Sequence, residues 1–404
     1  MRAFGFDTRV PTLVAVLDRI RERTTVSRVE LAEATGLTQA SMTHAVRKLI
    51  ALGFVHEVGT ASSGRGTPRR LLALRADACY MVGVQFDRFS AVGVVVDLGG
   101  RVVARREIPK AGERDPAPVI RELAEAVEAM LDSAGVPRSK VLGIGLATYG
   151  PQDRDSGVLL TPQPTPAWRH YPLAATLEER TGLPVAIEND ATAAGIGVQA
   201  QGGVSPSFAV VFMSGGIGSG LIIDGHPYRG TTSNGLELGH ISIDALGPPC
   251  RCGNRGCLDN IAGPMALSAR AREDSAMVAR LGLGEDPLRD FTAIGRAALS
   301  GDTAAAELLD TSIQRLSVAT VTLVNLFDVG RVVLAGRAFT EAGTAYRDAL
   351  QDAFDNAVFM RRVHSVRAEL AGDVTHAAAV GGAMVVLRNL LESPSAASGR
   401  GPER

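Results

Sequence analysis

The sequence predicts an α/β protein with a smaller, mainly helical domain at its N-terminus, and three observations lead to this prediction. Residues 12–52 carry apolar side chains at helical spacing in three short stretches. From about Met81 onwards, short apolar strands alternate with helical stretches, an order typical of α/β folds. The chain has 404 residues, of which 46% are hydrophobic and 21% charged, enough for two or three hydrophobic cores. We place the domain boundary between residues 77 and 78.

The composition also limits the classes of protein to consider. We find no basic N-terminal segment followed by an apolar run, and no window approaches 18 uninterrupted apolar residues. We therefore expect a cytoplasmic protein without a membrane partner. Residues 1–77 contain 12 Lys and Arg against 7 Asp and Glu, although the whole chain has a net charge of −1. This basic region is where we look for nucleic-acid contacts.

Residues 1–77 are predicted to form a winged helix-turn-helix. Ser27 and Glu30 form a capping-box pattern that opens a helix, and this helix stops at Gly36. The next helix begins at Thr38 and ends at Gly53. Two short helices joined by a glycine turn are typical of a motif whose second helix enters the major groove of DNA. Two strand-like stretches then flank a flexible loop and form the wing.

The predicted DNA contacts lie on the outward face of the third helix and on the wing. They are Thr38, Gln39, Ala40, Thr43, His44 and Arg47 on the helix, and Arg65, Arg69 and Arg70 on the hairpin. Guanidinium groups on such a hairpin reach phosphates or a minor groove of double-stranded DNA. The alternative is a three-helix interaction module with a solvated hairpin. The turn glycine, the polar helix face and the arginines together favour DNA binding.

Residues 78–392 are predicted to form two α/β units. Residues 81–108 are predicted to form a three-stranded meander with a turn at Gly99 and Gly100, and the same order starts again near residue 208. Two helical stretches, a strand near 329–336 and a final helix complete the second half. Two such units imply two lobes with a cleft between them. We assign lobe 1 to about 78–198 plus the helix 376–391, lobe 2 to about 199–375, and a disordered tail to 393–404.

Three of the four cysteines fall within the stretch "CRCGNRGCLD", Cys250 to Asp259. Clustered cysteines indicate a disulfide, a redox pair or a metal site. In a reducing compartment a disulfide framework is disfavoured, so the cluster is better interpreted as metal ligands.

Four ordered motifs resemble those of the ROK family of sugar kinases and sugar-responsive repressors. They are "GIGLATYGPQDRDSGVLLTP", "LPVAIENDATAA", "NGLELGH" and "CRCGNRGCLD". The similarity covers nearly the whole chain, and the winged helix-turn-helix resembles the repressor branch. The resemblance implies a two-lobed, actin/hexokinase-like (ribonuclease H-like) domain that assembles as a homodimer or homotetramer.

The resemblance also implies one structural Zn²⁺ per chain. Its ligands would be His240, Cys250, Cys252 and Cys257. Three thiolates and one imidazole complete a tetrahedral site and leave no open position for catalysis. The alternative for the histidine is a side chain that is merely satisfied in the core.

The sugar contacts implied by the family are Asn189, Asp190, Glu237, His240 and Asp259. The Asn-Asp pair binds sugar hydroxyls, and in the kinases the Asp supplies the catalytic base. Asp190 could instead be only a helix N-cap. Asp259 stands where the family usually has Glu, which puts its ligand contact in doubt. Gln163 and Trp168 are further candidates for shaping sugar selectivity.

The phosphate-binding loops depart from the kinase pattern. A kinase of this family needs a loop resembling Asp-x-Gly-Gly-Thr, but this chain has Gln85 and then Asp87 and Arg88 in place of the glycine pair. Losing these glycines removes both space and N–H donors for phosphate. The glycines of "MSGGIGSG" remain and could serve simple turn chemistry. We predict a sugar-responsive repressor of carbohydrate genes without catalytic residues; the alternatives are a DNA-binding sugar kinase and a regulator controlled by a protein partner.

Overall fold

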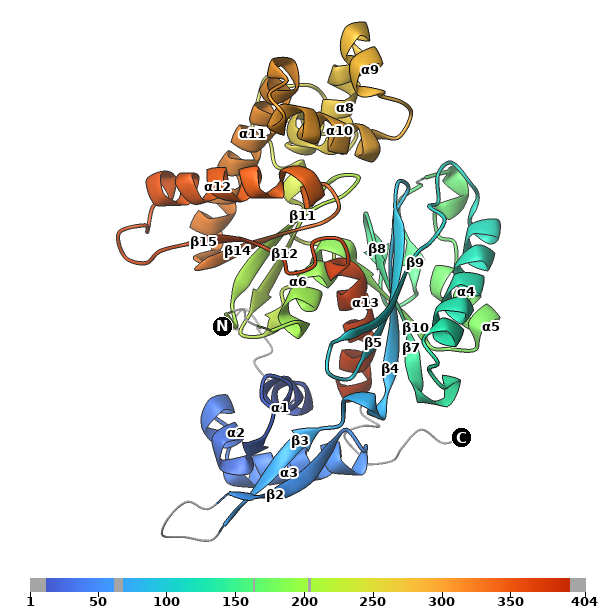
Figure 1. The fold of residues 1–404 in the computed structure, drawn as a ribbon, viewed down its shortest axis with the longest axis vertical. Coiled ribbons are helices and arrows are strands. Elements are labelled where there is room, and N and C mark those ends of the chain that lie inside the picture. Colours follow the sequence, from blue (N-terminus) through green and yellow to red (C-terminus); the bar gives the residue numbers. More distant parts are fainter. Residues whose placement is uncertain (1–11, 62–67, 163, 203–204, 393–404) are drawn as a thin grey trace.

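The computed structural model describes residues 12–61, 68–162, 164–202 and 205–392. Two of the predicted contact residues, Arg65 and Gln163, and the predicted tail at 393–404 lie outside these ranges. Within them, the chain is α/β, with a small N-terminal unit below two larger lobes (Figure 1).

The N-terminal unit has three helices and a three-stranded sheet. The helices are α1 (Thr12–Arg21), α2 (Arg28–Thr35) and α3 (Gln39–Ala51), and the strands are β1 (Val26–Ser27), β2 (Val55–Ala61) and β3 (Arg69–Leu74), in the order β1-β3-β2. The predicted capping box of Ser27 and Glu30, the left-handed Gly36 and the N-cap Thr38 are all confirmed. The short strand β1, which we did not predict, pairs with β3 and joins the helices to the wing.

The first lobe is built on a sheet with the strand order β10-β7-β4-β5-β6. Its strands are β4 (Tyr80–Phe86), β5 (Ala91–Asp97), β6 (Val102–Glu107), β7 (Val141–Thr148) and β10 (Val185–Asn189). The first three form the predicted antiparallel meander, and β7 and β10 pair in parallel. Helices α4 (Pro116–Ser133) and α5 (Leu173–Thr181) lie on the outer side of this sheet, near the small hairpin of β8 (Gln152–Asp153) and β9 (Val158–Leu159) (Figure 1).

The second lobe repeats this order with the sheet β13-β12-β11-β14-β15. Its strands are β11 (Phe208–Met213), β12 (Ile217–Ile223), β13 (His226–Pro227), β14 (Arg331–Ala335) and β15 (Arg367–Leu370). We expected two helical stretches before β14, and the structure has five: α7 (Asp259–Ala262), α8 (Pro264–Arg272), α9 (Ser275–Leu281), α10 (Pro287–Leu299) and α11 (Thr303–Phe327). Breaks at Gly263, Asp274 and Gly282 separate the shorter ones. Helix α12 (Phe339–Ala357) connects β14 to β15.

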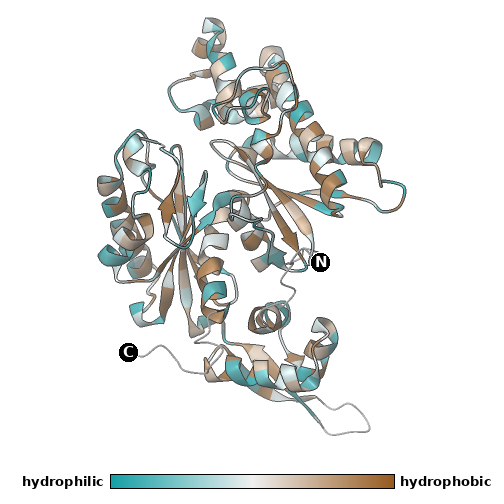
Figure 2. Ribbon diagram, turned by 180° about the vertical axis from the view of Figure 1, so that it is seen from behind, coloured by the Kyte–Doolittle hydropathy of each residue, from teal (hydrophilic) through white to brown (hydrophobic). Residues whose placement is uncertain are grey.

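Two helices, α6 (Asp190–Ala200) and α13 (Ala377–Glu392), lie between the two sheets (Figure 1). They approach each other closely because glycines face backbone: a Cβ on Gly381 would lie 1.6 Å from the Ala193 carbonyl oxygen, and one on Gly197 would lie 1.9 Å from that of Ala377. Side chains larger than hydrogen cannot fit at these two points. Figure 2 shows mainly brown, hydrophobic ribbon on the strands that enclose this pair. Among the described residues, no helix is long and apolar enough to cross a membrane.

Candidate functional site

A cleft of about 580 Å³ lies between the two lobes, and all five predicted sugar-binding residues line it. They come from three separate segments: the β10–α6 junction, the 3₁₀ turn at Leu238–His240 and the start of α7. We call the part of the cleft formed by Asn189, Asp190, Glu237, His240 and Asp259 the sugar half. The structure therefore brings together residues that are up to 70 positions apart in the sequence.

The two polar residues at the β10–α6 junction, Asn189 and Asp190, make different contacts. Asn189 is the N-cap of α6, and its Oδ1 accepts a hydrogen bond from the Thr192 backbone N–H at 3.0 Å. Asp190 is the first residue of the helix and not its N-cap. Its Oδ1 accepts from the adjacent Ala191 N–H at 2.8 Å, and its side chain faces the cleft.

The pKa of the Asp190 carboxyl is raised above its ordinary value. Removal from bulk water raises its pKa to about 8, and the nearby Asp87 carboxylate adds to the rise. A carboxyl group in this state holds its proton near neutral pH and can exchange hydrogen bonds with a polyhydroxylated ligand. A pKa of this value would also suit a general base, so it does not by itself separate sensing from catalysis.

Asp259 is anchored to the glycine turn between β11 and β12. Its Oδ1 accepts from the Ile217 backbone N–H at 3.0 Å, and a Cβ on Gly216 would lie only 3.2 Å from the same oxygen. Burial raises the pKa of this carboxyl. The shorter side chain thus links α7 to the turn, whereas Glu237 is exposed at the open side of the cleft.

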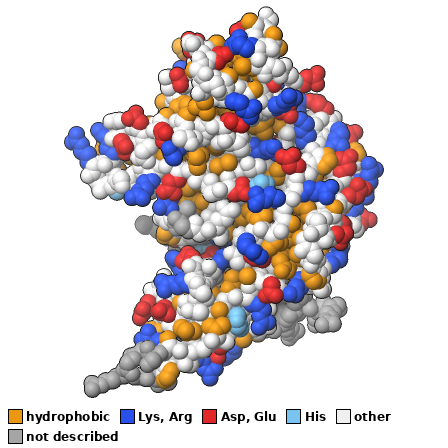
Figure 3. Space-filling view, viewed as in Figure 1, with side chains coloured by type: hydrophobic (Ala, Val, Ile, Leu, Met, Phe, Trp, Pro, Cys, Tyr) orange, Lys and Arg blue, Asp and Glu red, His pale blue; other side chains and the backbone are white. Residues whose placement is uncertain are grey.

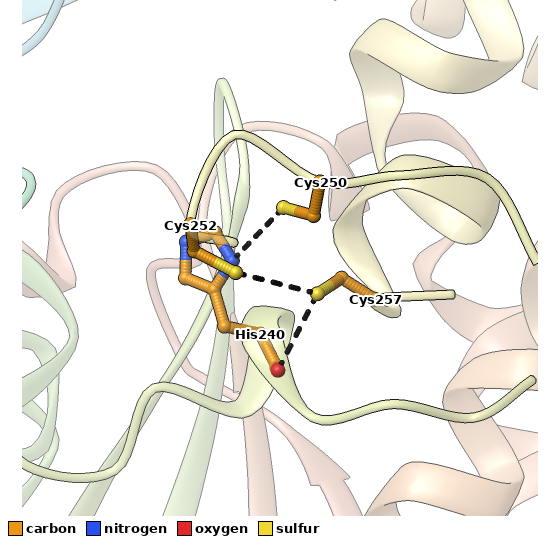
Figure 4. A group of neighbouring side chains, drawn as sticks. All are labelled: His240, Cys250, Cys252 and Cys257. Carbon is orange, nitrogen blue, oxygen red and sulfur yellow. Dashed lines mark hydrogen bonds between the residues drawn. The ribbon is translucent and has the colours of Figure 1, made fainter. Parts of the chain in front are cut away.

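His240, Cys250, Cys252 and Cys257 form one cluster beside the sugar half (Figure 4). Their ligand atoms all lie within 4.8 Å of one another. His240 Nδ1 is 3.6 Å from Cys250 Sγ, and Cys252 Sγ is 3.7 Å from Cys257 Sγ. Zinc bond lengths in a tetrahedral site require separations of about 3.6 Å between N and S and about 3.8 Å between two S atoms. The four side chains therefore fit a tetrahedral metal ion.

The other end of the cleft is lined by Asp87, Phe89 and Gly215 and is filled by the protein's own side chains. We call this end the phosphate half. Asp87 is buried, and its Oδ1 accepts from the backbone N–H groups of Phe89 at 2.7 Å and Ser90 at 2.6 Å. Its Oδ2 accepts from Gln85 Nε2 and from Ser214 Oγ, both at 2.9 Å. The N–H groups that a phosphate would need are thus already engaged by a carboxylate.

Two further side chains occupy the phosphate half. The ring of Phe89 packs against Gly215, since a Cβ on that glycine would lie 2.7 Å from the ring. Arg337 reaches across from lobe 2, with Nη1 3.4 Å from Ser90 Oγ and Nη2 3.1 Å from Glu107 Oε1. The glycines of the second loop are therefore kept for close packing between the lobes.

One sequence expectation was wrong, and other cleft residues were missed. Trp168 is fully buried in lobe 1, where its ring packs 5.3 Å from that of Phe86 and its Nε1 donates to the Arg114 carbonyl, so it does not reach the cleft. Tyr149 lines the cleft, and its buried hydroxyl has no hydrogen-bond partner among the described residues. Arg251, between two of the cysteines, also lines it. A tyrosine directly before the Gly-Pro turn was the available signal.

The predicted DNA-contact residues on α3 all lie on one exposed face: Thr38, Gln39, Ala40, Thr43, His44 and Arg47. On the wing, Arg69 is exposed, but Arg70 forms an ion pair with Glu57. The other carboxylate oxygen of Glu57, Oε1, lies 2.9 Å from Arg28 Nη2 and forms a second ion pair. Over the view of the whole molecule in Figure 3, basic and acidic side chains are interspersed. The α3 face and the wing therefore remain the surface with the features of a DNA reader.

A winged helix-turn-helix joined to a two-lobed domain with a cleft defines the class of sensor-linked DNA-binding proteins. More specifically, residues 81–389 match the model described as "ROK family", and the chain belongs to this family.

The similar proteins include a putative xylose repressor from Caldicellulosiruptor sp., 27% identical over 94% of this chain and 96% of that protein. The DNA-binding transcriptional dual regulator NagC of Escherichia coli is 28% identical over 91% and 89%. In fold, the chain resembles a solved ROK family transcriptional regulator, a homologue of the E. coli MLC protein, with a TM-score of 0.69, 23% identity and coverage of 94% and 96%.

Proposed function

We propose that this protein is a sugar-responsive, DNA-binding transcriptional regulator that acts as a repressor of genes for carbohydrate uptake or catabolism. A sugar or sugar derivative would bind in the sugar half, change the arrangement of the lobes and release operator DNA. Such release requires that the ligand bind one arrangement more tightly than the other. The names of the relatives, a xylose repressor and NagC, support this class of function.

The observation that carries the proposal is the contrast within the cleft. Asp190, Glu237 and Tyr149 line the sugar half, and the buried Tyr149 hydroxyl has no hydrogen-bond partner among the described residues. In the phosphate half, Asp87 holds four donors and Phe89 fills the space over Gly215. Positioned reactants are a precondition for phosphoryl transfer, and in the described part of the chain Asp87 takes the Phe89 and Ser90 N–H groups that could position a phosphate. A sugar can therefore be bound without being phosphorylated.

We further propose one structural Zn²⁺ per chain, held by His240, Cys250, Cys252 and Cys257. The ion would complete a closed tetrahedral site and fix the segment that carries Glu237 and the start of α7. His240 belongs to the sugar half as well as to the cluster, so the metal would hold one wall of the ligand cleft in place.

We assign DNA binding to the α3 face and the wing, in a cytoplasmic homodimer or homotetramer that binds a duplex operator. In this proposal Gln39 and His44 would read base edges in the major groove, and Arg47, Arg69 and Arg65 would contact phosphates. Two copies would match a two-fold symmetric operator. Arg70 would have to leave Glu57 to reach DNA.

A binding screen tests the proposal. Glucose, xylose, N-acetylglucosamine and their phosphate esters are added to the full-length protein, and thermal unfolding and affinity for a duplex enriched from a random pool are recorded. At least one compound should raise the melting temperature by mass action and weaken DNA binding. Arg47→Ala should weaken DNA binding and reduce its salt dependence, whereas Arg121→Ala on α4 should do neither. Absence of a response to any sugar of the panel, or absence of DNA binding, would refute the proposal.

A further inference from the structure

Helix α6 connects the cleft to the DNA-binding domain. Its first residue, Asp190, lines the sugar half, and its last turn, at Gln199 and Ala200, lines a small cavity together with α1 of the winged helix-turn-helix. Eleven residues at 1.5 Å each span about 16 Å. The close glycine contacts with α13 prevent α6 from sliding independently, so the two helices act as one unit.

Arg388 lies on α13 at the end of this unit, where three parts of the molecule meet. Its Nη2 donates to Gln199 Oε1 of α6 at 2.9 Å and lies 3.4 Å from Asp18 Oδ2 of α1. Both of its Nη atoms reach the Gly225 carbonyl in lobe 2, at 3.3 and 3.4 Å. One guanidinium group therefore contacts α6, lobe 2 and the DNA-binding domain.

The contact is buried and charged. The Arg388 side chain is only 7% exposed, and Asp18 is the carboxylate with which it forms an ion pair in the described part of the chain. Asp18 also pairs with Arg21 at 2.5 Å, and Arg21 Nε donates to the Leu98 carbonyl in lobe 1 at 3.1 Å. Without Asp18 the buried guanidinium would keep the neutral acceptors Gln199 and Gly225 but lose its carboxylate partner, and breaking a buried ion pair in this way is destabilising.

We propose that Asp18 and Arg388 are the positioning residues that couple the cleft to the DNA-binding domain. The inference rests on the proposed function and adds the route by which ligand binding in the cleft changes the DNA-binding domain. A shift of α6 and α13 relative to the turn at Gly225 would change which partners Arg388 can hold. Asp18 would then change the orientation of α1, and with it the angle at which α3 is presented to DNA. This arrangement is a two-state element that both sites can bias.

The test uses the full-length protein with two variants and one control. Asp18→Asn removes the charge from the domain contact. Gln199→Met keeps both charges of the ion pair but removes the hydrogen bonds of Gln199 with Arg388 and with the Gly225 carbonyl, which help to hold the guanidinium beside Asp18. Glu22→Gln is the matched control, because Glu22 is an exposed acidic residue just after the same helix, paired with Arg19. Operator affinity is measured with and without the sugars of the screen, and sugar affinity is measured by calorimetry.

Both variants should bind the sugar within about threefold of the wild-type affinity but lose most of the response. The ratio of operator dissociation constants with and without sugar should fall by about fivefold or more, since couplings of this kind span about 5- to 150-fold. The Glu22→Gln control should keep the wild-type ratio. A wild-type ratio in both variants would overturn the inference while leaving the proposed function in place.

Hydrogen exchange measured without sugar tests the inference independently of the proposed function. Hydrogen exchange in α1 should become faster in Asp18→Asn and in Gln199→Met than in the control, because the contact that fixes α1 on α13 is weakened. Unchanged exchange in both variants would overturn the inference, whether or not any sugar acts. If no sugar in the panel binds the wild type, the proposed function fails, and faster exchange would still support the role of Asp18 and Arg388 in fixing the domain. Gln199 is only partly buried, so this variant serves if Asp18→Asn does not fold.

Discussion

The two halves of the interlobe cleft differ in what their polar groups contact. In the phosphate half, the Asp87 carboxylate takes four hydrogen bonds from neighbouring residues, and Arg337 bridges the lobes. In the sugar half, the Asp190 carboxylate takes one backbone hydrogen bond and lines the cleft, and the buried Tyr149 hydroxyl has no partner among the described residues. Buried polar groups that a protein leaves unsatisfied point to a ligand, and satisfied ones do not. The comparison indicates a fold that has kept sugar recognition and filled the place of the phosphates.

The largest expected effect follows from removing a ligand of the metal cluster, which should alter the sugar half and leave the phosphate half unchanged. Cys257→Ser removes the most deeply buried ligand of the cluster and should reduce bound zinc from one per chain to background. Hydrogen exchange should then rise across residues 237–261 in the sugar half and stay unchanged at 85–90 in the phosphate half. Elemental analysis and exchange measurements check this.

Cys79→Ala is the control for the zinc prediction, because Cys79 is a buried free cysteine outside the cluster. It should keep the metal. Equal zinc in wild type and Cys257→Ser would show that the cluster is not the metal site.

The second prediction concerns sugar affinity. At pH 9 the Asp190 carboxyl is ionised, and Asp190→Asn should weaken binding by about 10- to 100-fold, since a hydrogen bond to a charged group contributes about 1.5–3 kcal/mol. At pH 6, where the wild-type group holds its proton, the difference should shrink. Calorimetry with the sugar found in the screen measures both values.

Arg337→Met in the phosphate half is the matched control, and it should leave the sugar dissociation constant within about threefold of wild type. A larger loss there than in Asp190→Asn would reverse the roles of the two halves.

The third prediction concerns the stability of the phosphate half. Ser214→Ala removes one of the four donors to Asp87 and should lower the free energy of unfolding by about 1–3 kcal/mol, because the group is buried. Glu107→Gln, which alters an exposed ion pair of Arg337, should change it by less than about 0.5 kcal/mol. Denaturant titration compares the two, and similar small changes in both would argue that the phosphate half is loosely held.

The fourth prediction concerns the pH dependence of stability. The folded-state pKa of Asp190 is raised to about 8, above its ordinary value near 4, so the folded protein holds this proton more tightly than the unfolded chain does. Its contribution to stability is present at low pH and is lost as the pH rises from about 4 to about 8. The stability of Asp190→Asn relative to wild type should therefore increase over this range in the absence of sugar, and a constant difference would show that the pKa is not raised.

The sequence predicted the overall organisation well, because its signals were local or came from ordered motifs. The caps at Ser27 and Thr38 and the two β-meanders follow from patterns within a few residues. Motif order was sufficient to place Asp190, Glu237 and Asp259 in one cleft. The assignment of these residues to a sugar, and the boundary at residue 77, stay predictions.

Features that depend on three-dimensional packing could not be predicted. The sequence shows Asp87 and Phe89 as departures from a glycine loop, but it does not show that one engages the free N–H groups and the other fills the space. Trp168 was misplaced because a loop sequence does not fix the direction of a side chain. Arg388 is an arginine in an apolar helix, and only the fold brings it to Asp18, 370 residues away in the chain.

The measurement that tests the central claim most directly is paired and uses one protein and one sugar. Release of the operator duplex and turnover of ATP are followed with the sugar that stabilises the protein in the screen. At pH 9 the account predicts sugar-dependent release that requires about 10- to 100-fold more sugar in Asp190→Asn, without sugar-dependent ATP turnover in either protein. ATP turnover in the wild type that requires the sugar and disappears in Asp190→Asn would contradict it and identify the cleft as a kinase active site.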